Sequence, residues 1–219
     1  MILLAADTSS NSTSLALYNN GEVYSMRADG AEPSASRMYV LLDAVLRAAG
    51  VEIRALEALA VGAGPGSFTG LRVSFAAMRT LAWTRGIPLI PVNSLEALVW
   101  PQRMLDAPLA VVQPARRGHV YQMALRAGAL IQEVGFYPLD EARARIRELG
   151  GGAFLAGTPD DLELELPVLV QREGPDAADI ARLALGRLEA GERPVLEDVL
   201  PLYLRPSDAE VSASLSENA

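Results

Sequence analysis

The sequence predicts an α/β protein of two consecutive lobes, each a mixed sheet with helices against its faces. Short apolar runs bounded by turn residues recur along the chain, which is typical of buried strands. Longer segments with apolar residues on one helical face lie between them. The order of these segments in the first half is repeated in the second half, which indicates an internal duplication.

The first half opens with three strands and continues with alternating helices and strands. Asn19-Asn20-Gly21 marks a tight turn between the second and third strands. In the first helix, Met38, Leu41, Leu42 and Val45 are spaced to cover one face. The expected elements are strands at 2–6, 14–18 and 22–27, a helix at 36–49, a strand at 59–63, a helix at 69–85, a strand at 89–92 and a helix after Asn93-Ser94.

The second half repeats three strands, helix, strand and helix, which is the pattern of the actin-like ATPase-type (ASKHA) folds. Asp176 is a plausible N-cap for its last helix. We assign residues 1–105 to the first lobe, 106–206 to the second, and 207–219 to a small, polar, acidic tail expected to be disordered. The expected elements are strands at 109–113, 120–125 and 130–137, a helix at 139–149, a strand at 153–156 and a helix at 176–190.

Composition excludes several classes of chemistry. The chain of 219 residues has no Cys, all 19 of its basic residues are Arg, and His119 is its single His. Thiolate nucleophiles, a phosphate-binding or Schiff-base lysine and a His pair for zinc or iron are therefore excluded. The net charge of −8 disfavours RNA binding by the chain alone. We expect a cytoplasmic protein without a membrane span, because no run reaches about 18 apolar residues.

The first polar cluster, Asp7-Thr8-Ser9, closes the first strand. In a sheet of this kind such residues face the crevice where ligands bind, so the hydroxyls and turn amides are candidates for phosphate binding. The alternative is that these side chains simply cap the turn.

The most distinctive segment is glycine-rich and runs from Gly62 to Arg72, between a strand and a helix. It lacks the lysine of a Walker loop and the glycine spacing of a dinucleotide site. Gly66, Gly70 and Ser74 are four apart and form a small-residue stripe on one helical face, which allows close approach of another backbone. Spacing alone leaves open whether that backbone belongs to this chain's sheet or to another subunit.

Residues 64–72 read GPGSFTGLR and resemble the hallmark GPGSFTGxR of the TsaB (formerly YeaZ) family. The opening 2–9, the segment 115–121 and the closing 201–205 resemble further family motifs in the expected order. Pro114, His119 and Ser34 depart from residues that are usual in the family, namely Asp, Glu and His.

This resemblance implies a non-catalytic subunit that supports a catalytic paralogue, TsaD, in forming threonylcarbamoyladenosine in tRNA. It implies a TsaE-type ATPase as a further partner, a homodimer when the chain is alone, tRNA contact only through the complex, no metal, and no nucleotide outside the complex. It also favours a subunit interface for the small-residue stripe, so Gly70→Arg is expected to abolish pairing and leave the lobe folded. The implied interface residues are Gly66, Gly70, Arg72, Ser74, Phe75, Met78, Met38, Leu41, Leu42 and Val45.

The alternative function is an independent ATPase or kinase with the same fold. It would need an acid in the opening hairpin of the second lobe, where the sequence has Gln113-Pro114. A glycoprotease would need a metal or a nucleophile–base pair, and the sequence shows neither.

Overall fold

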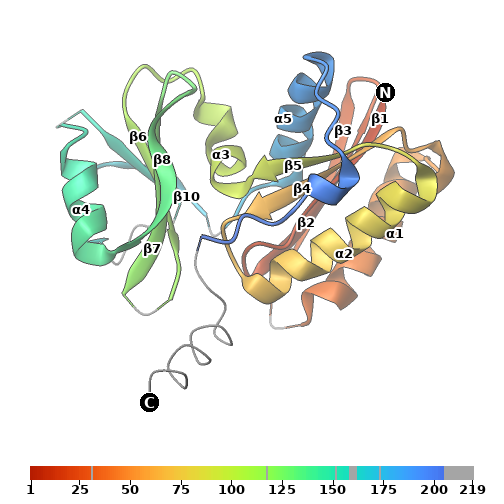
Figure 1. Ribbon diagram of the computed structural model, residues 1–219, viewed down its shortest axis with the longest axis horizontal. Helices are drawn as coiled ribbons and strands as arrows, with labels where there is room; N and C mark the ends of the chain where they lie inside the picture. The colour runs from red at the N-terminus through yellow and green to blue at the C-terminus, as the bar shows by residue number, and fades with distance from the viewer. Residues whose placement is uncertain (31, 117, 151, 158–161, 173, 205–219) are drawn as a thin grey trace.

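The computed structural model describes residues 1–204 except 31, 117, 151, 158–161 and 173. It contains two five-stranded sheets that lie side by side along the long axis of the molecule (Figure 1). The predicted tail at 207–219 lies outside the described residues. No helix of the described part is long and apolar enough to cross a membrane.

The first sheet has the order β3-β2-β1-β4-β5. β1 pairs antiparallel with β2 and parallel with β4, so it is central and its apolar run is buried from both faces. The strands are β1 (Ile2–Asp7), β2 (Ser12–Asn19), β3 (Glu22–Asp29), β4 (Ala58–Gly64) and β5 (Leu89–Asn93).

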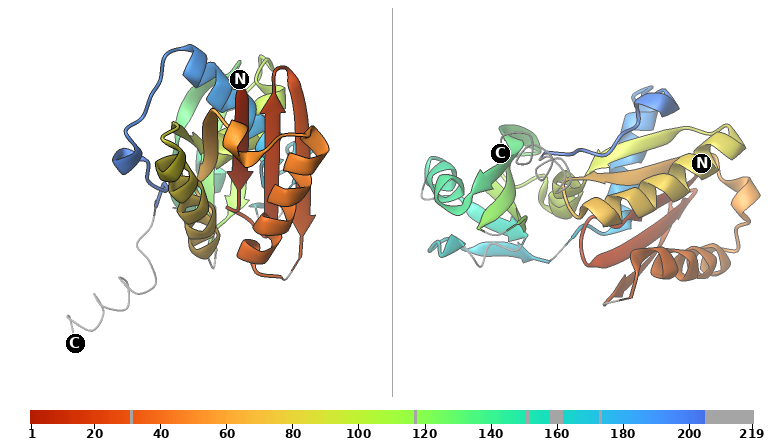
Figure 2. Two further views of the ribbon diagram at one scale, coloured as in Figure 1. Left: turned by 90° about the vertical axis from the view of Figure 1, so that its right-hand side faces the viewer. Right: turned by 60° about the horizontal axis from the view of Figure 1, so that its bottom comes forward.

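Two long helices, α1 (Ser34–Ala49) and α2 (Phe68–Arg85), cover one face of this sheet (Figure 2). Met38 and Val45 of α1 and Phe75 and Met78 of α2 share a core with β1, β2 and β4. The predicted helical face of α1 is thereby confirmed as a core-facing one. Each helix ends at a glycine in the left-handed conformation, as helix C-termini commonly do.

The second sheet has the order β10-β9-β6-β7-β8. Taken from its other edge, this order matches the first sheet strand for strand, which confirms the duplicated actin-like fold. Its strands are β6 (Leu109–Pro114), β7 (His119–Arg126), β8 (Ala129–Pro138), β9 (Phe154–Gly157) and β10 (Val168–Gln171), and α4 (Leu139–Arg147) covers one face.

The second unit differs from the prediction in two ways. The edge strand β10 was not predicted, and the described residues between β9 and β10 contain no α-helix. The last helix, α5 (Ala177–Glu189), therefore follows the fifth strand, as α3 (Ser94–Val99) does in the first unit. The physical reason is that the segment before β10 is short, acidic and punctuated by proline, so it offers no apolar helical face.

Each unit's last helix packs across the boundary between the sheets. Ala181 and Ala184 of α5 share a core with β1, β4 and β5, on the face opposite α1 and α2. Leu95 and Leu98 of α3 pack against the second sheet. The proposed division at residues 105 and 106 stays a prediction, but α5 lies in the range assigned to the second lobe and packs against the first sheet.

The described chain ends in a strap that follows α5 and returns across α2. The strap starts near the 3₁₀ turn η4 (Leu196–Asp198). Elsewhere in the chain, further 3₁₀ turns are η1 (Ile53–Ala55) and η2 (Trp100–Gln102). Val199 is buried in the first core, and the Leu202 amide donates to the Ala63 carbonyl at 2.7 Å. Leu204 packs against the core of the second sheet, so the strap touches both lobes.

Candidate functional site

Asp7 lies at the end of β1 and is 1% exposed. Its Oδ1 accepts hydrogen bonds from the amide and hydroxyl of Ser9 at 2.9 and 2.8 Å, and its Oδ2 accepts one from the Ser94 hydroxyl at 2.9 Å. Burial raises the pKa of the Asp7 carboxyl, and these hydrogen bonds together with the charge of Arg27 oppose that rise. A Cβ on Gly62 would lie 1.9 Å from Oδ2, so glycine is required beside this carboxylate.

The hydroxyls of the two residues that follow Asp7 are also hydrogen-bonded within the chain. Thr8 is fully buried, and its hydroxyl donates to the Gly70 carbonyl at 2.6 Å. Ser9 is 7% exposed and donates its hydroxyl to Asp7. All three side chains therefore have internal partners, which is the turn-capping arrangement, and phosphate binding by them stays a prediction.

Two members of the small-residue stripe, Gly70 and Ser74, are buried, and Gly66 is half-buried. A Cβ on Gly70 would lie 1.9 Å from the Thr8 carbonyl oxygen, and one on Gly66 would lie 2.2 Å from the Ser9 carbonyl oxygen. Ser74 is fully buried. The backbone that approaches Gly66 and Gly70 is the chain's own β1–β2 turn, and an additional role of these three residues in a subunit interface stays a prediction.

Most of the other implied interface residues are buried for the same reason: they face the first sheet. Their exposed fractions are at most 8%, and they are Phe75, Met78, Met38, Leu41 and Val45. Two remain open to a partner. Arg72 is exposed, with its guanidinium 4.0 Å from the centre of the Phe68 ring, and Leu42 is half-buried.

The outer faces of α1 and α2 carry apolar side chains that the sequence analysis missed. Tyr39 and Val40 on α1 are 70% and 69% exposed, and Trp83 on α2 is 76% exposed. Next to Tyr39, an open groove of about 540 Å³ runs along α1 to the loop that follows it, with Leu42 and Ile53 in its lining. Tyr39 and Val40 are apolar residues that do not belong to the core-facing positions of α1. An apolar residue off that face is the sequence signal that would have indicated an exposed apolar surface.

The central strand of the second sheet, β6, has Gln113 as its second-to-last residue. Gln113 of β6 donates its side-chain amide to the Arg172 carbonyl at 3.1 Å. On the next strand, His119 stacks on Phe136 with ring centres 4.6 Å apart. No group of three or more His, Cys, Asp or Glu among the described residues is arranged to hold a metal ion.

Comparison with known proteins decides the family. A family model described as TsaD: tRNA N6-adenosine threonylcarbamoyltransferase matches residues 30–135. The TsaB protein of Escherichia coli K12 is 29% identical over 94% of this chain and 95% of its own length. A solved Pseudomonas aeruginosa structure, described as similar to the peptidase YEAZ, covers 93% of this chain and 99% of its own, with a TM-score of 0.80 and 28% identity. The chain belongs to the TsaB (YeaZ) family.

The geometry explains why a TsaB-family chain carries glycines in its hallmark segment. Gly64 has a φ of +92°, a conformation that favours glycine. Gly66 and Gly70 admit the β1–β2 turn, and between them the Ser67 hydroxyl accepts the Gly70 amide at 3.2 Å and caps α2. In this TsaB-family structure the hallmark therefore seats α2 on the end of β1.

Proposed function

We propose that the chain is a non-catalytic subunit of the machinery that forms threonylcarbamoyladenosine in tRNA, and that it binds a TsaD-type catalytic subunit through the outer faces of α1 and α2. Relatives in its family are named for the biosynthesis of this modified nucleoside. The TsaD family model matches the part of the chain that includes α1 and α2.

The proposed docking site is supported by the exposed apolar side chains on the outer faces of α1 and α2. Trp83, Tyr39 and Val40 together leave two aromatic rings and a β-branched side chain in solvent. Aromatic side chains are enriched at the centres of protein interfaces because they bury a large area with little loss of freedom. The groove beside Tyr39 has Asp43 and Arg47 at its rim, which supplies polar contacts around an apolar centre.

The occupant that fits is a protein with the same pair of helices. Because the matched TsaD model covers α1 and α2, a TsaD-type subunit would present its own equivalents of them, and the two lobes would pair about a pseudo-twofold axis. A second copy of this chain has the same surface, so we propose a homodimer when the catalytic subunit is absent. A TsaE-type ATPase would join the pair, and tRNA would be contacted through the complex.

We also propose that this chain catalyses no reaction by itself. Asp7 is the last residue of β1 and Gln113 the second-to-last of β6, and both side chains hold backbone or hydroxyl groups of the chain itself. The independent ATPase would need these positions to face a nucleotide. We propose that nucleotide binding, where it occurs, requires the complex, and that the protein works in the cytoplasm.

Co-purification with the TsaD-type protein from the same source tests this proposal. Trp83→Glu and Val40→Glu each place a charge on the apolar surface, and we expect either to abolish a complex that the unchanged chain forms. Met104→Glu is the matched control, because Met104 is 81% exposed at another site. A complex that both α1 and α2 variants retain would contradict the docking site. ATP turnover by this chain alone, without a complex, would favour the independent ATPase.

A further inference from the structure

The chain crosses from the second sheet back to the first between β10 and α5, and Arg172 begins this crossing. The Arg172 amide donates to the Gly157 carbonyl of β9 at 3.1 Å. The Arg172 carbonyl accepts from the Gln113 side chain of β6 at 3.1 Å. Both backbone groups of this residue are therefore held by the second sheet.

The side chain of Arg172 reaches in the other direction. Its Nη2 donates to the Leu98 carbonyl at the end of α3, at 2.7 Å, and to Asp179 Oδ2 of α5, at 3.3 Å. Asp179 is 3% exposed, so its carboxylate needs a cationic partner there. α5 packs on the first sheet. Arg172 therefore connects the second sheet to α3 of the first unit and to α5 of the second unit.

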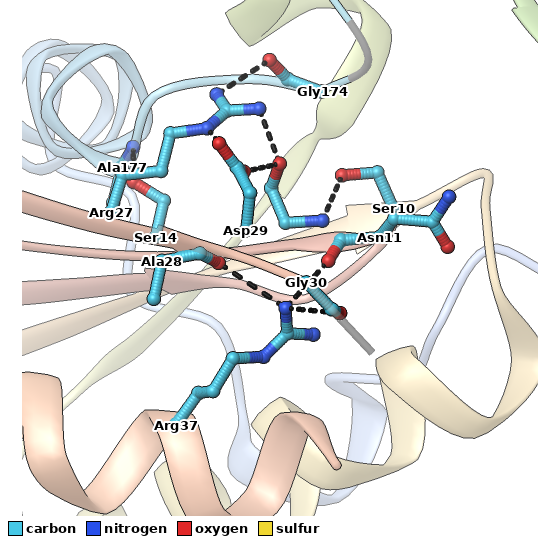
Figure 3. Close-up of polar contacts among 11 residues, drawn as sticks. Ser10, Asn11, Ser14, Arg27, Ala28, Asp29, Gly30, Arg37, Gly174 and Ala177 are labelled. Carbon is cyan, nitrogen blue, oxygen red and sulfur yellow. Dashed lines mark hydrogen bonds and ion pairs between the residues drawn. The ribbon is translucent and has the colours of Figure 1, made fainter. Parts of the chain in front are cut away.

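The rest of the crossing is attached to the first sheet. Arg27 of β3 donates to the Gly174 carbonyl at 3.4 Å, and the Ala177 amide donates to the Ser14 hydroxyl of β2 at 2.9 Å (Figure 3). A single residue lies between Arg172, held by the second sheet, and Gly174, held by the first. Since each residue extends the chain by at most about 3.6 Å, the two attachment points are separated by only a short length of chain.

We propose that the joint between the two lobes is fixed, and that Arg172 is the positioning residue that fixes it. Lobes that close around a ligand turn about a few residues whose backbone is free to change its dihedral angles. In this crossing the backbone is bonded on both sides of the boundary, and the Arg172 guanidinium adds a bond to each helix that passes between the sheets. This inference is independent of the proposed function.

A distance measurement between the lobes tests this proposal. Because the sequence contains no cysteine, spin labels attach only to cysteines that are introduced. Ala48→Cys on α1 and Ala144→Cys on α4 place spin labels at exposed positions of the full chain. Double electron–electron resonance should give one narrow distance distribution for this labelled protein. With Arg172→Met added, we expect the distribution to broaden about twofold or more, as hinge motion becomes possible.

Arg182→Met is the matched control, because Arg182 pairs with the same Asp179 at 2.7 Å but lies three residues away on the same helix. It should leave the distribution narrow. Gln113→Leu, which frees the Arg172 carbonyl and keeps the guanidinium bonds, should broaden it by a smaller factor. Circular dichroism checks that each variant is folded. An unchanged width in folded Arg172→Met overturns the proposal, and if that variant does not fold, an unchanged width in Gln113→Leu does so.

Discussion

Gly70 and Thr8 are in contact through their backbones. The Thr8 hydroxyl donates to the Gly70 carbonyl at 2.6 Å, and a Cβ on Gly70 would lie 1.9 Å from the Thr8 carbonyl oxygen. α2 therefore sits directly on the end of β1. Gly70→Arg is expected to disrupt the first lobe itself, in contrast to the expectation from sequence that only pairing would be lost.

Gly70→Ala should destabilise the protein by about 3 kcal/mol or more, because the added methyl meets backbone that cannot move aside. Gly186→Ala is the matched control: Gly186 also lies inside a helix, α5, but a Cβ there meets nothing within 4 Å. It should stabilise by about 0.5–1 kcal/mol, since alanine favours helix over glycine. Urea denaturation measures both. Equal effects of the two substitutions would contradict the contact.

Thr8 and Thr13 are both fully buried, but only Thr8 has a partner for its hydroxyl in the structure. Thr8→Val should cost about 0.5–1.5 kcal/mol, because it removes the buried hydrogen bond between the Thr8 hydroxyl and the Gly70 carbonyl. Thr13→Val removes a hydroxyl without a partner and keeps the shape, so it should be neutral or stabilising. Thermal unfolding of the two variants side by side distinguishes them, and a larger loss for Thr13→Val would refute this prediction.

The buried carboxyl of Asp7 should contribute a pH dependence to stability. Burial raises its pKa in the folded state above the ordinary value of 3.8, so the folded protein holds the proton more tightly than the unfolded chain. The resulting stabilisation is present below pH 3.8 and is lost as the pH rises through the raised pKa. Asp7→Asn cannot titrate, so its stability relative to the unchanged protein should increase from pH 4 to pH 7.

Urea midpoints across that range measure the Asp7 effect, with the exposed Asp198→Asn as control. A difference between Asp7→Asn and the unchanged protein that stays constant with pH would rule out the effect of burial.

Asp176 caps α5 and also contacts β3. Its carboxylate accepts from the Ala178 amide at 2.8 Å and from the Ser25 hydroxyl at 2.6 Å. Asp176→Ala should cost about 1–2 kcal/mol, the usual range for losing an N-cap. Glu189→Ala, at the exposed other end of α5, should stay within about 0.5 kcal/mol. Similar losses in the two variants, measured by chemical denaturation, would speak against the cap.

Within the described part of the chain, periodicity and turn residues predicted every strand except β10 and placed the five α-helices. β10 was missed because Val168–Gln171 is four residues long, directly follows Pro167, and does not alternate between apolar and polar residues. β2 starts earlier than predicted, at Ser12, because its polar first residues are buried by contacts with other elements. A sequence pattern does not contain those contacts.

The site was harder to predict than the fold. The spacing of Gly66, Gly70 and Ser74 correctly indicated a close approach of another backbone, but within one helix it carries no information on which backbone approaches. Arg172 was not singled out at all. Its contacts come from residues far away in the sequence, among them Leu98, so only tertiary structure brings them together.

The crossing of α5 onto the first sheet has a consequence for how the chain is made. The last strand of that sheet ends at Asn93, but the helix that covers its second face ends at Glu189. At the usual rates of protein synthesis, about 5 to 20 s pass between these two points. During that interval the apolar second face of the first sheet emerges from the ribosome without the helix that covers it, so the first lobe is completed only after Glu189 has been made.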